Sequence, residues 1–259
     1  MEEITSRNNP AVKSAAALKE LKERKSTGLF LLEGARLCKD AALNGVEIIR
    51  FFVTEKAMAK YPSEAELLRD TAESSFLVPE SVSEKLSDTK SSQGFFAVCR
   101  QPDISLEINY GGMYVFTDNV QNPDNMGAIV RTAEAMGADG IIINSGCDIY
   151  SPKALRASMG ALLRFPVIRT DSPREILTEC KNNNMKIFAS IVDASAESVT
   201  AAPKDGGCVL IIGNEGNGIG EEVLSLSTNR ITIPMKGKAE SLNASAAATV
   251  LIWEFMKDR

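Results

Sequence analysis

Three segments of the chain combine polar side chains with glycines directly after apolar stretches, and chemistry could occur there. Residues 118–137 read DNVQNPDNMGAIVRTAEAMG, and residues 210–223 read LIIGNEGNGIGEEV. A third segment, residues 231–255, starts with ITIPMKGKAESLNAS. In sheets of parallel strands, ligands bind beyond the carboxyl ends of the strands. Each segment leaves a predicted strand in that direction, so together they form the candidate ligand site.

The first segment contains an arginine in a position suited to an anion. Pro123 and Asn125 predict a turn before a helix over roughly 126–136, and Gly127 allows close approach of the backbone. The amino end of a helix presents free N–H groups, and Arg131, one turn into this helix, has a planar guanidinium that suits phosphate. The alternative is an ordinary strand-turn-helix junction with a surface arginine.

The second segment is a glycine-rich turn that contains one carboxylate. Its four glycines are Gly213, Gly216, Gly218 and Gly220. They predict either backbone lying against a ligand or tight turns with positive φ. The segment is not a Walker loop, because no Gly-Lys-Ser/Thr follows, and the dinucleotide fingerprint fails because Glu221 occupies the place of its third glycine. Glu215 needs partners at the end of a strand, and Arg131 is a candidate.

In the third segment, Pro234 and Gly237 interrupt a strand and predict a loop before a helix over 241–257. Ser241 and Asn243 are candidate pocket residues, and the alternative is that they cap the helix, a position that both residue types favour. The helix contains small residues, which permit close packing within the domain or against a second subunit. These are Ala244, Ala246, Ala247 and Ala248.

The chain contains no histidine, which excludes Ser-His-Asp and Cys-His catalysis, histidine general bases and histidine metal ligands. Chemistry must therefore come from carboxylates, Lys, Arg, Ser, Tyr, amides or a cofactor with its own reactivity. Five cysteines are scattered without a CxxC spacing, so we expect reduced cytoplasmic thiols and neither a disulfide framework nor a zinc cluster. The amino-terminal residues are acidic and polar, and no apolar run approaches membrane-spanning length.

The net charge of −5 does not indicate a nucleic-acid-binding protein, but the charge is uneven. Residues 5–25 and 151–174 are both rich in Lys and Arg and contain few carboxylates. These stretches are either phosphate-binding patches or solvated helix faces.

Strands alternate with helices along the chain, which predicts an α/β layer structure. We expect early strands within 29–37 and at 48–54, 76–79 and 95–100. A helix that continues through Gly45 is expected to follow the first of these strands, and other early helices are expected at 11–26, 63–73 and 80–87. Residues 101–112, with a Pro, an Asn and a Gly pair, form the expected domain boundary. Later strands are expected at 113–120, 140–144, 165–169, 186–192, 208–215 and 231–235, and further helices at 152–162 and 173–183. The continuous aliphatic runs in this part predict an open parallel sheet covered on both faces.

Together, in this order and spacing, the three segments resemble the SpoU/TrmH family of RNA ribose 2′-O-methyltransferases. The family pattern runs Asn-x-Gly-x-x-x-Arg, then Gly-x-Glu-Gly-x-Gly, then Ile-Pro-Met-x-Gly and Ser-Leu-Asn-x-Ser. The matching residues are Asn125, Gly127 and Arg131, then Gly213, Glu215, Gly216 and Gly218, and finally Ile233, Pro234, Met235, Gly237, Ser241, Leu242, Asn243 and Ser245.

The resemblance implies two α/β domains. Residues 113–259 would form the methyltransferase domain, a parallel sheet whose carboxyl-terminal part is threaded as a deep trefoil knot, which composition alone could never suggest. Residues 1–105 would form a smaller RNA-binding domain that resembles ribosomal protein L30e. Residues 150–167 resemble the branch of the family that modifies rRNA. Family members are homodimers, and the alanine-rich last helix is compatible with such packing.

The resemblance also implies the cofactor, S-adenosylmethionine, and the residues around it. Cofactor contacts are expected from Gly213, Asn214, Glu215, Gly218, Ile233, Met235, Ser241 and Leu242. Arg131 would stabilise the developing alkoxide of the ribose, because an arginine is always protonated and is a poor general base. Asn125 would orient the arginine or substrate, Glu215 would hold that network, and Ser241 with Asn243 would complete the pocket. No metal is implied.

Several readings stay open beside methylation of rRNA. The substrate could be tRNA, the methyl acceptor could be a base nitrogen as in other knotted methyltransferases, or the chain could be a catalytically silent RNA-binding paralogue. The Ser-Leu-Asn motif at 241–243 argues against a base acceptor, and the filled candidate positions argue against a silent paralogue. A Rossmann-type nucleotide-binding enzyme is disfavoured by the failed fingerprint.

Overall fold

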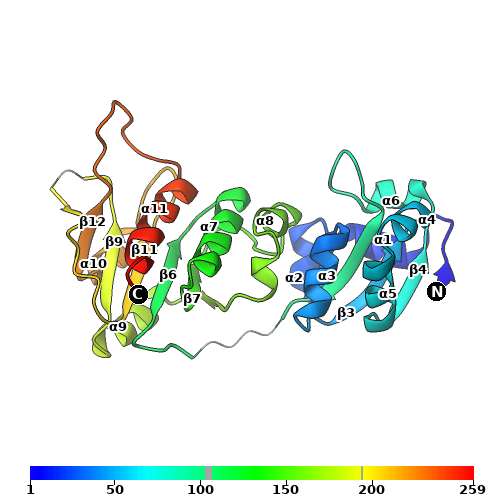
Figure 1. Ribbon diagram of the computed structural model, residues 1–259, viewed down its shortest axis with the longest axis horizontal. Coiled ribbons are helices and arrows are strands. Elements are labelled where there is room, and N and C mark those ends of the chain that lie inside the picture. Colours follow the sequence, from blue (N-terminus) through cyan, green and yellow to red (C-terminus); the bar gives the residue numbers. More distant parts are fainter. Residues whose placement is uncertain (103–106, 194) are drawn as a thin grey trace. The chain divides into compact units, whose positions relative to one another are not determined.

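The computed structural model describes residues 1–102, 107–193 and 195–259, and contacts divide the chain into two compact units (Figure 1). Unit 1 consists of Met1–Asp103 together with Asp148–Arg164, and unit 2 of Ile104–Cys147 together with Phe165–Arg259. Residues 103–106 of the expected boundary, including the expected end of the first domain at 105, lie outside the described residues.

Unit 1 contains a mixed five-stranded sheet in the order β1-β4-β3-β5-β2. Strand β5 runs antiparallel to β3 and β2, and the other pairs are parallel. The strands are β1 (Glu2–Glu3), β2 (Leu29–Glu33), β3 (Ile48–Val53), β4 (Ser74–Leu77) and β5 (Phe95–Arg100). Apart from the short β1, these are the strands that the sequence predicts. Their apolar side chains, among them Phe52, Phe96 and Val98, form the core with the helices.

The helices of unit 1 agree with the predicted alternation except at two places. They are α1 (Pro10–Ala17), α2 (Leu21–Thr27), α3 (Ala35–Leu43), α4 (Glu55–Lys60), α5 (Pro62–Thr71), α6 (Glu80–Leu86) and α8 (Pro152–Ala157). The single helix predicted over 11–26 is wrong, because the backbone becomes extended at Glu20 and separates α1 from α2. Helix α4 was not predicted, and it begins where the Thr54 hydroxyl accepts a hydrogen bond from Ala57 N–H.

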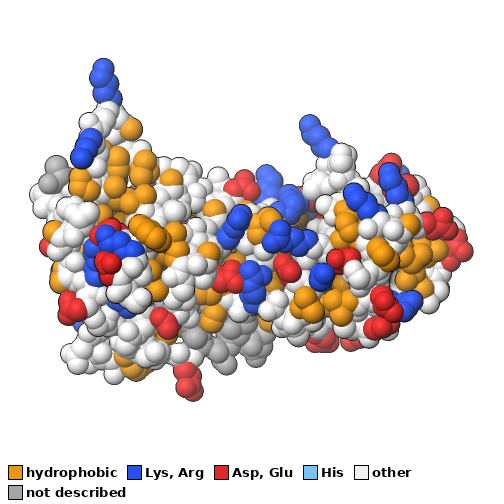
Figure 2. Space-filling view, in the orientation of Figure 1, with side chains coloured by type: hydrophobic (Ala, Val, Ile, Leu, Met, Phe, Trp, Pro, Cys, Tyr) orange, Lys and Arg blue, Asp and Glu red, His pale blue; other side chains and the backbone are white. Residues whose placement is uncertain are grey.

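The loop between α6 and β5 projects from unit 1 and carries a basic side chain at its outer end (Figures 1 and 2). Its base is held by one carboxylate. Glu33 accepts hydrogen bonds from Ser87 Oγ (2.6 Å), Asp88 N (2.9 Å) and Thr89 Oγ1 (2.8 Å). Lys90 is the one basic residue of this loop sequence.

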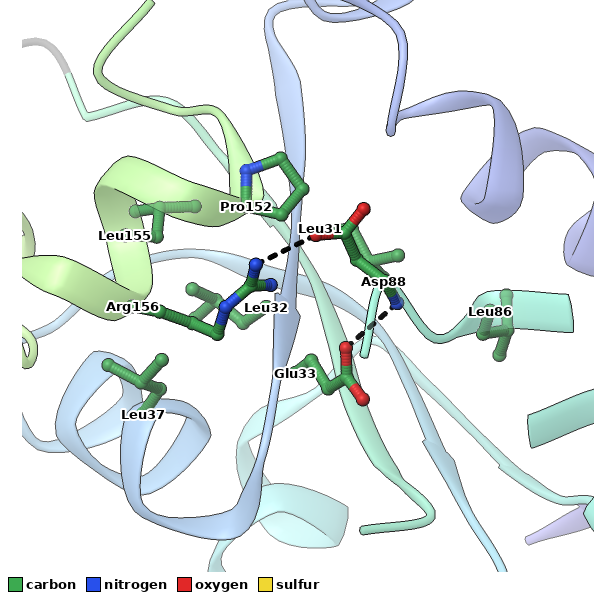
Figure 3. A pocket seen from close by; sticks show the side chains of 9 residues that line it. All are labelled: Leu31, Leu32, Glu33, Leu37, Leu86, Asp88, Pro152, Leu155 and Arg156. Atoms are coloured by element: carbon green, nitrogen blue, oxygen red, sulfur yellow. Dashed lines mark hydrogen bonds and ion pairs between the residues drawn. The ribbon is translucent and has the colours of Figure 1, made fainter. Parts of the chain in front are cut away.

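Residues 148–164, predicted as part of the carboxyl-terminal domain, make their contacts with unit 1. The segment contains α8 and a 3₁₀ turn (Ala161–Leu163) in place of one predicted helix. The Tyr150 ring packs 5.0 Å from that of Phe30, centroid to centroid. Figure 3 shows Arg156 of α8 reaching Asp88, and its Nη2 donates to Asp88 Oδ2 at 2.8 Å. The sequence predicted a helix here but not the neighbours against which it packs.

Unit 2 contains the predicted parallel sheet, with seven strands in the order β10-β12-β9-β11-β6-β7-β8. They are β6 (Met113–Asp118), β7 (Gly140–Asn144), β8 (Val167–Thr170), β9 (Lys186–Ser190), β10 (Glu197–Ser198), β11 (Cys208–Ile212) and β12 (Asn229–Thr232). The helices are α7 (Pro123–Ala135), α9 (Pro173–Asn182), α10 (Glu221–Leu226) and α11 (Ala244–Met256). The short β10 and α10 were not predicted.

Helices cover both faces of this sheet, as the aliphatic strands require. Helices α7 and α11 pack side by side (Figure 1), and the ring of Phe255 on α11 lies 4.8 Å from that of Phe188 on β9. Helix α9 packs against α10, and Leu177 joins Val209 and Ile211 of β11 in the core beneath them. Among the described residues, no helix has the length and apolar character needed to cross a membrane.

The strand order places a topological switch point between β6 and β11. From β6 the chain continues to β7 and β8 on one side, whereas β9, β12 and β10 lie on the far side of β11. Ligands in open α/β sheets bind beyond the carboxyl ends of the strands at such a point. The ends of β6 and β11 are therefore where a ligand site is expected, and two of the three candidate segments begin there.

A buried ion pair holds residues 148–164 in unit 1. Arg24 Nε lies 2.6 Å from Asp148 Oδ2, and Arg24 Nη1 donates to the carbonyl of Leu18 at 2.6 Å. The side chains are only 4% and 13% exposed. Removing one partner of such a pair leaves an uncompensated charge, so Arg24→Met is expected to lower the free energy of unfolding by about 3 kcal/mol.

Urea unfolding would measure this loss, with Arg174→Met as the matched control. Arg174 pairs with Glu222 at 3.0 Å, but both side chains are more than half exposed. The control is expected to cost less than about 1 kcal/mol. Equal losses in the two variants would contradict the role given to Arg24.

Candidate functional site

Two loops leave the sheet side by side at the switch point. Strand β6 ends at Asp118, and residues 119–122 lead into α7. Strand β11 ends at Ile212, and residues 213–220 lead into α10. Because Thr117 and Ile212 are register partners in adjacent parallel strands, the first two candidate segments meet as predicted.

The glycine-rich loop is a tight turn closed by one asparagine. The backbones of Asn214 and Gly218 exchange hydrogen bonds of 2.8 and 3.0 Å, and Asn214 Oδ1 accepts from the N–H groups of Gly216 and Asn217. Gly218 has φ +68°. A Cβ at Gly213 would lie 2.5 Å from the carbonyl carbon of Gly218, so no other residue fits there. Positive φ and close backbone packing therefore both account for glycines of this loop.

Glu215, within this loop, binds the turn that follows β6. Its Oε1 accepts from Asn125 Nδ2 at 2.8 Å and from Asn122 N at 3.2 Å, and its Oε2 accepts from Gln121 N at 3.2 Å. Asn125 is buried, with 5% of its surface exposed. The predicted proximity of Asn125 and Glu215 is thus observed, whereas Arg131, the suggested partner of Glu215, is not among its hydrogen-bonding partners.

The hydrogen bonds keep Glu215 ionised. Partial burial raises the pKa of its carboxyl, but the bonds from Asn125 and from the backbone of Gln121 and Asn122 outweigh burial, so the pKa lies below its ordinary value. Glu215 therefore acts as a fixed anion that organises the turn, and not as a proton donor.

Arg131 lies farther along its helix than the sequence indicated. Helix α7 begins at Pro123, capped by the side chain of Asn122, which accepts from Asp124 N. At 1.5 Å per residue, Arg131 lies roughly 12 Å along the axis from Pro123, two turns in and not one. Arg131 is exposed, and across residues 1–102, 107–193 and 195–259 no hydrogen bond or ion pair engages its guanidinium.

The third segment forms an exposed loop that projects between β12 and α11 (Figure 1). Asn243 is the N-cap of α11, and its Oδ1 accepts from Ser245 N at 2.9 Å and Ser245 Oγ at 2.7 Å. The capping alternative therefore holds for Asn243. Ser241 is exposed. Within the described residues, neither side chain makes a hydrogen bond to the Glu215 cluster.

The residues around the two loops fit a nucleoside-like ligand. A Cβ added at Gly218 or Gly237 would meet nothing within 4 Å, so bare backbone faces open space there. The loop after β12 contributes apolar side chains: Ile233 is half-buried, and Met235 and Leu242 are 37% and 39% exposed. Backbone groups together with apolar side chains are what an adenosine-type ligand requires.

Sequence reasoning missed three polar residues at the same edge of the sheet. Asp118 ends β6, Asn119 follows it with φ +57°, and Asn144 ends β7. Asn119 N donates to the carbonyl of Asn144 at 2.8 Å, and Asn214 Nδ2 donates to the carbonyl of Asn119 at 2.8 Å. The signal used for Glu215 was a carboxylate at the end of a buried strand. The same signal would also have identified Asp118.

Comparisons with known proteins match both parts of the chain. The SpoU rRNA Methylase family matches residues 112–253, and the MRM3-like substrate binding domain matches residues 9–97. The chain is 30% identical over 254 residues to the 23S rRNA (guanosine(2553)-2'-O)-methyltransferase RlmP of Bacillus subtilis, covering 98% of each chain. It is 28% identical to the 23S rRNA (uridine(2479)-2'-O)-methyltransferase of Streptomyces viridochromogenes, covering 99% of this chain and 92% of that one.

A solved structure is similar along the whole chain. The AdoMet-bound rRNA methyltransferase from Sinorhizobium meliloti is 27% identical and superimposes with a TM-score of 0.87. The match covers 99% of this chain and 98% of that one. The similarity therefore includes both units, and not only the parallel sheet.

Glu215→Gln tests whether the anion organises the turn. A glutamine offers one acceptor oxygen in place of two, so the midpoint of thermal unfolding is expected to fall at neutral pH. Since the pKa of Glu215 is lowered by folding, its contribution is present above the ordinary value of 4.5 and is lost as pH falls through the lower folded-state pKa. The deficit of the variant should therefore shrink in acid.

Differential scanning fluorimetry across this pH range would measure the deficit. Glu240→Gln, at an exposed loop position of the same unit, is the control and should match the parent chain at every pH. A deficit of constant size down to the most acidic condition would show that the charge of Glu215 is unimportant.

Proposed function

The chain belongs to the SpoU rRNA Methylase family, and from this we propose that its unit 2 transfers a methyl group from S-adenosylmethionine to a ribose 2′-hydroxyl of rRNA. The observation that carries the proposal is the match over residues 112–253, which contains the first two candidate segments and the third as far as residue 253. Similarity to RlmP over 98% of both chains supports 23S rRNA as the substrate class. The chain is an S-adenosylmethionine-dependent RNA methyltransferase.

The glycine-rich loop and the loop after β12 are proposed to hold the cofactor. Backbone groups of Gly213, Asn214 and Gly218 would bind its polar atoms, and Ile233, Met235, Ser241 and Leu242 would line its other side. S-adenosylmethionine supplies an activated methyl group, so the protein has only to orient the ribose and stabilise its charge. The open space over Gly218 and Gly237 supports this assignment.

Arg131 is the proposed catalytic residue. Its guanidinium is exposed and held by no hydrogen bond among the described residues, so it is available to a substrate oxygen. An arginine stays protonated, and it would therefore stabilise the developing alkoxide while the proton leaves to phosphate or water. Glu215 would fix Asn125, and through it the turn ahead of Arg131. Ser241 and Asn243 would complete the pocket.

Unit 1 is proposed to bind the RNA, as its match to a substrate-binding domain supports. Within the basic stretch 151–174, Arg156 is engaged by Asp88 and Arg174 by Glu222. Lys153 is exposed, as are Arg7 and Lys13 in the amino-terminal basic stretch, and these three are the proposed phosphate contacts. A tRNA substrate and a silent RNA-binding paralogue are the alternatives that the assay below separates.

We also propose a homodimer, a trefoil knot around the loop after β12, and a cytoplasmic location. Val250 and Trp253 on α11 are 40% and 57% exposed, and Figure 2 shows hydrophobic side chains gathered on unit 2. Such an apolar surface suits a subunit interface. The cytoplasmic location is supported by four buried cysteine thiols, Cys38, Cys99, Cys180 and Cys208.

The methyl acceptor can be identified directly. The purified protein would be incubated with methyl-labelled S-adenosylmethionine and either unmodified rRNA or tRNA, and the RNA then digested to nucleosides. Label in a 2′-O-methylnucleoside from rRNA is expected. Label from tRNA alone would favour the tRNA alternative, and label in a base would overturn the acceptor. Cofactor binding without transfer to either free RNA or ribosomal particles would favour the silent paralogue.

In the same assay Arg131→Ala should lower turnover about 100-fold or more, because a donor to the developing charge is lost. Its affinity for S-adenosylmethionine, measured by calorimetry, should stay unchanged. Arg174→Ala, on the opposite face of the sheet, is the control and should retain parental turnover. Near-normal turnover of a folded Arg131→Ala variant would exclude the catalytic role.

The dimer depends on the apolar face of α11. Trp253→Glu is expected to convert a dimer into a monomer in size-exclusion chromatography with light scattering, because a buried charge disfavours the interface. Val192→Glu, at a residue 75% exposed in the same unit, should leave the dimer intact. A monomeric parent chain, or a dimeric Trp253→Glu variant, would argue against this surface.

A further inference from the structure

Asp118 is a buried carboxylate that the proposed mechanism does not use. It ends β6 with 6% of its surface exposed. The other buried charged residue among those described, Arg24, is paired with Asp148, whereas no Lys or Arg in the described part of the chain forms an ion pair with Asp118. A buried charge without a counter-ion must be compensated by hydrogen bonds.

Two hydrogen bonds compensate it, one to each oxygen. Asp118 Oδ1 accepts from Asn144 Nδ2 at 2.8 Å, and Oδ2 accepts from the N–H of Gly220 at 2.7 Å. Asn144 ends β7, and Gly220 is the last residue of the glycine-rich loop before α10. One carboxylate therefore joins the ends of two adjacent strands to the exit of the loop.

The tether defines the shape of the whole loop. Its entry is fixed at Ile212, where β11 pairs with β6, and its middle is closed by the exchange between Asn214 and Gly218. Gly220 is the point where the loop leaves this turn, and a Cβ there would lie 3.3 Å from Asp118 Oδ2, tighter than ordinary contact. Glycine thus permits the carboxylate to approach the backbone closely.

We propose that Asp118 is a positioning residue for the cofactor: it holds the exit of the glycine-rich loop so that the backbone between Gly213 and Gly218 is preorganised to bind S-adenosylmethionine. The inference rests on the proposed function, because it takes this loop as the cofactor site. Asp118 acts through Gly220 and is not itself placed against the cofactor or the ribose.

A carboxylate suits this position because both neighbours donate to it. Asparagine at position 118 has one neutral acceptor oxygen, so Asp118→Asn removes the charge that strengthens the bond from Gly220, and it keeps the contact with Asn144 only if that amide rotates to present its Oδ1. A reciprocal exchange restores a carboxylate to the pair. In the double variant Asp118→Asn/Asn144→Asp, the amide oxygen at 118 can accept from Gly220 and the amide N–H₂ can donate to the carboxylate introduced at 144.

Asp139, an exposed residue just before β7, provides a control at the opposite end of β6. Its Oδ2 accepts from the N–H of Met113, the first residue of β6, at 2.8 Å. Asp139→Asn therefore removes a charge and weakens a carboxylate-to-backbone bond of the same kind, at the edge of the sheet away from the loop. It should affect stability without affecting the cofactor.

The test is the dissociation constant for S-adenosylmethionine, measured by calorimetry on the full chain without RNA. Asp118→Asn is expected to raise it at least about tenfold, since the bond from Gly220 loses its charged acceptor. Asp139→Asn should bind like the parent, and the double variant should recover most of the affinity. Hydrogen exchange of the peptide spanning 213–220 should accelerate in Asp118→Asn and return towards the parental rate in the double variant.

Parental affinity in a folded Asp118→Asn variant would overturn the inference, as would equal losses in Asp118→Asn and Asp139→Asn. If Asp118→Asn does not fold, Asn144→Ala leaves the bond to Gly220 in place and releases the carboxylate from β7. A several-fold weaker affinity then supports the inference, and an unchanged one opposes it. A parent chain that binds no S-adenosylmethionine would instead refute the proposed function.

Discussion

The candidate site depends on hydrogen bonds from backbone and amide N–H groups to two carboxylates. Glu215 binds the turn at 121–125 from the glycine-rich loop, and Asp118 binds the exit of that loop from β6. These contacts run in opposite directions between segments 90 to 102 residues apart in sequence, and they depend on the pairing of β6 with β11. Each carboxylate has lost part of its water and accepts at least one hydrogen bond at each oxygen, so movement of either loop would leave an acceptor unsatisfied.

This arrangement suits a chain without histidine. The described site residues include carboxylates, amides, glycines and one arginine, and histidine, the residue type whose ordinary pKa lies near neutral pH, does not occur in the sequence. Its contribution to catalysis must come from orientation and fixed charge. Rigid loops are then a chemical requirement, because charge stabilisation is effective only when the donors are already in place before the reaction begins.

The sequence predicted what depends on local pattern and not what depends on packing partners. Aliphatic runs identified the parallel sheet, and polar residues after β6 and β11 predicted that the segments containing Asn125 and Glu215 meet at one edge of it, although Arg131 was the partner suggested for Glu215. The start of α7 was placed too late because Pro123 was interpreted as a turn residue, although a proline in the first turn after a capping Asn122 also begins a helix. The unit to which residues 148–164 belong could not be predicted, since periodicity shows that a face is buried but not against what. The activity was predicted from a sequence pattern shared with a protein family, and helix, strand and turn propensities contain no such information.

The crossing of the chain between the two units limits how such a protein can be divided. Unit 1 includes Asp148–Arg164, a segment that follows β7 and precedes β8 of unit 2 in the sequence. The chain therefore changes from one unit to the other after residues 103, 147 and 164. A truncation at the first crossing would deprive unit 1 of Asp148 and Tyr150 and leave Arg24 as an unpaired charge. Neither unit is therefore a contiguous module, and recombination at the 101–112 segment alone could not exchange one intact unit for another.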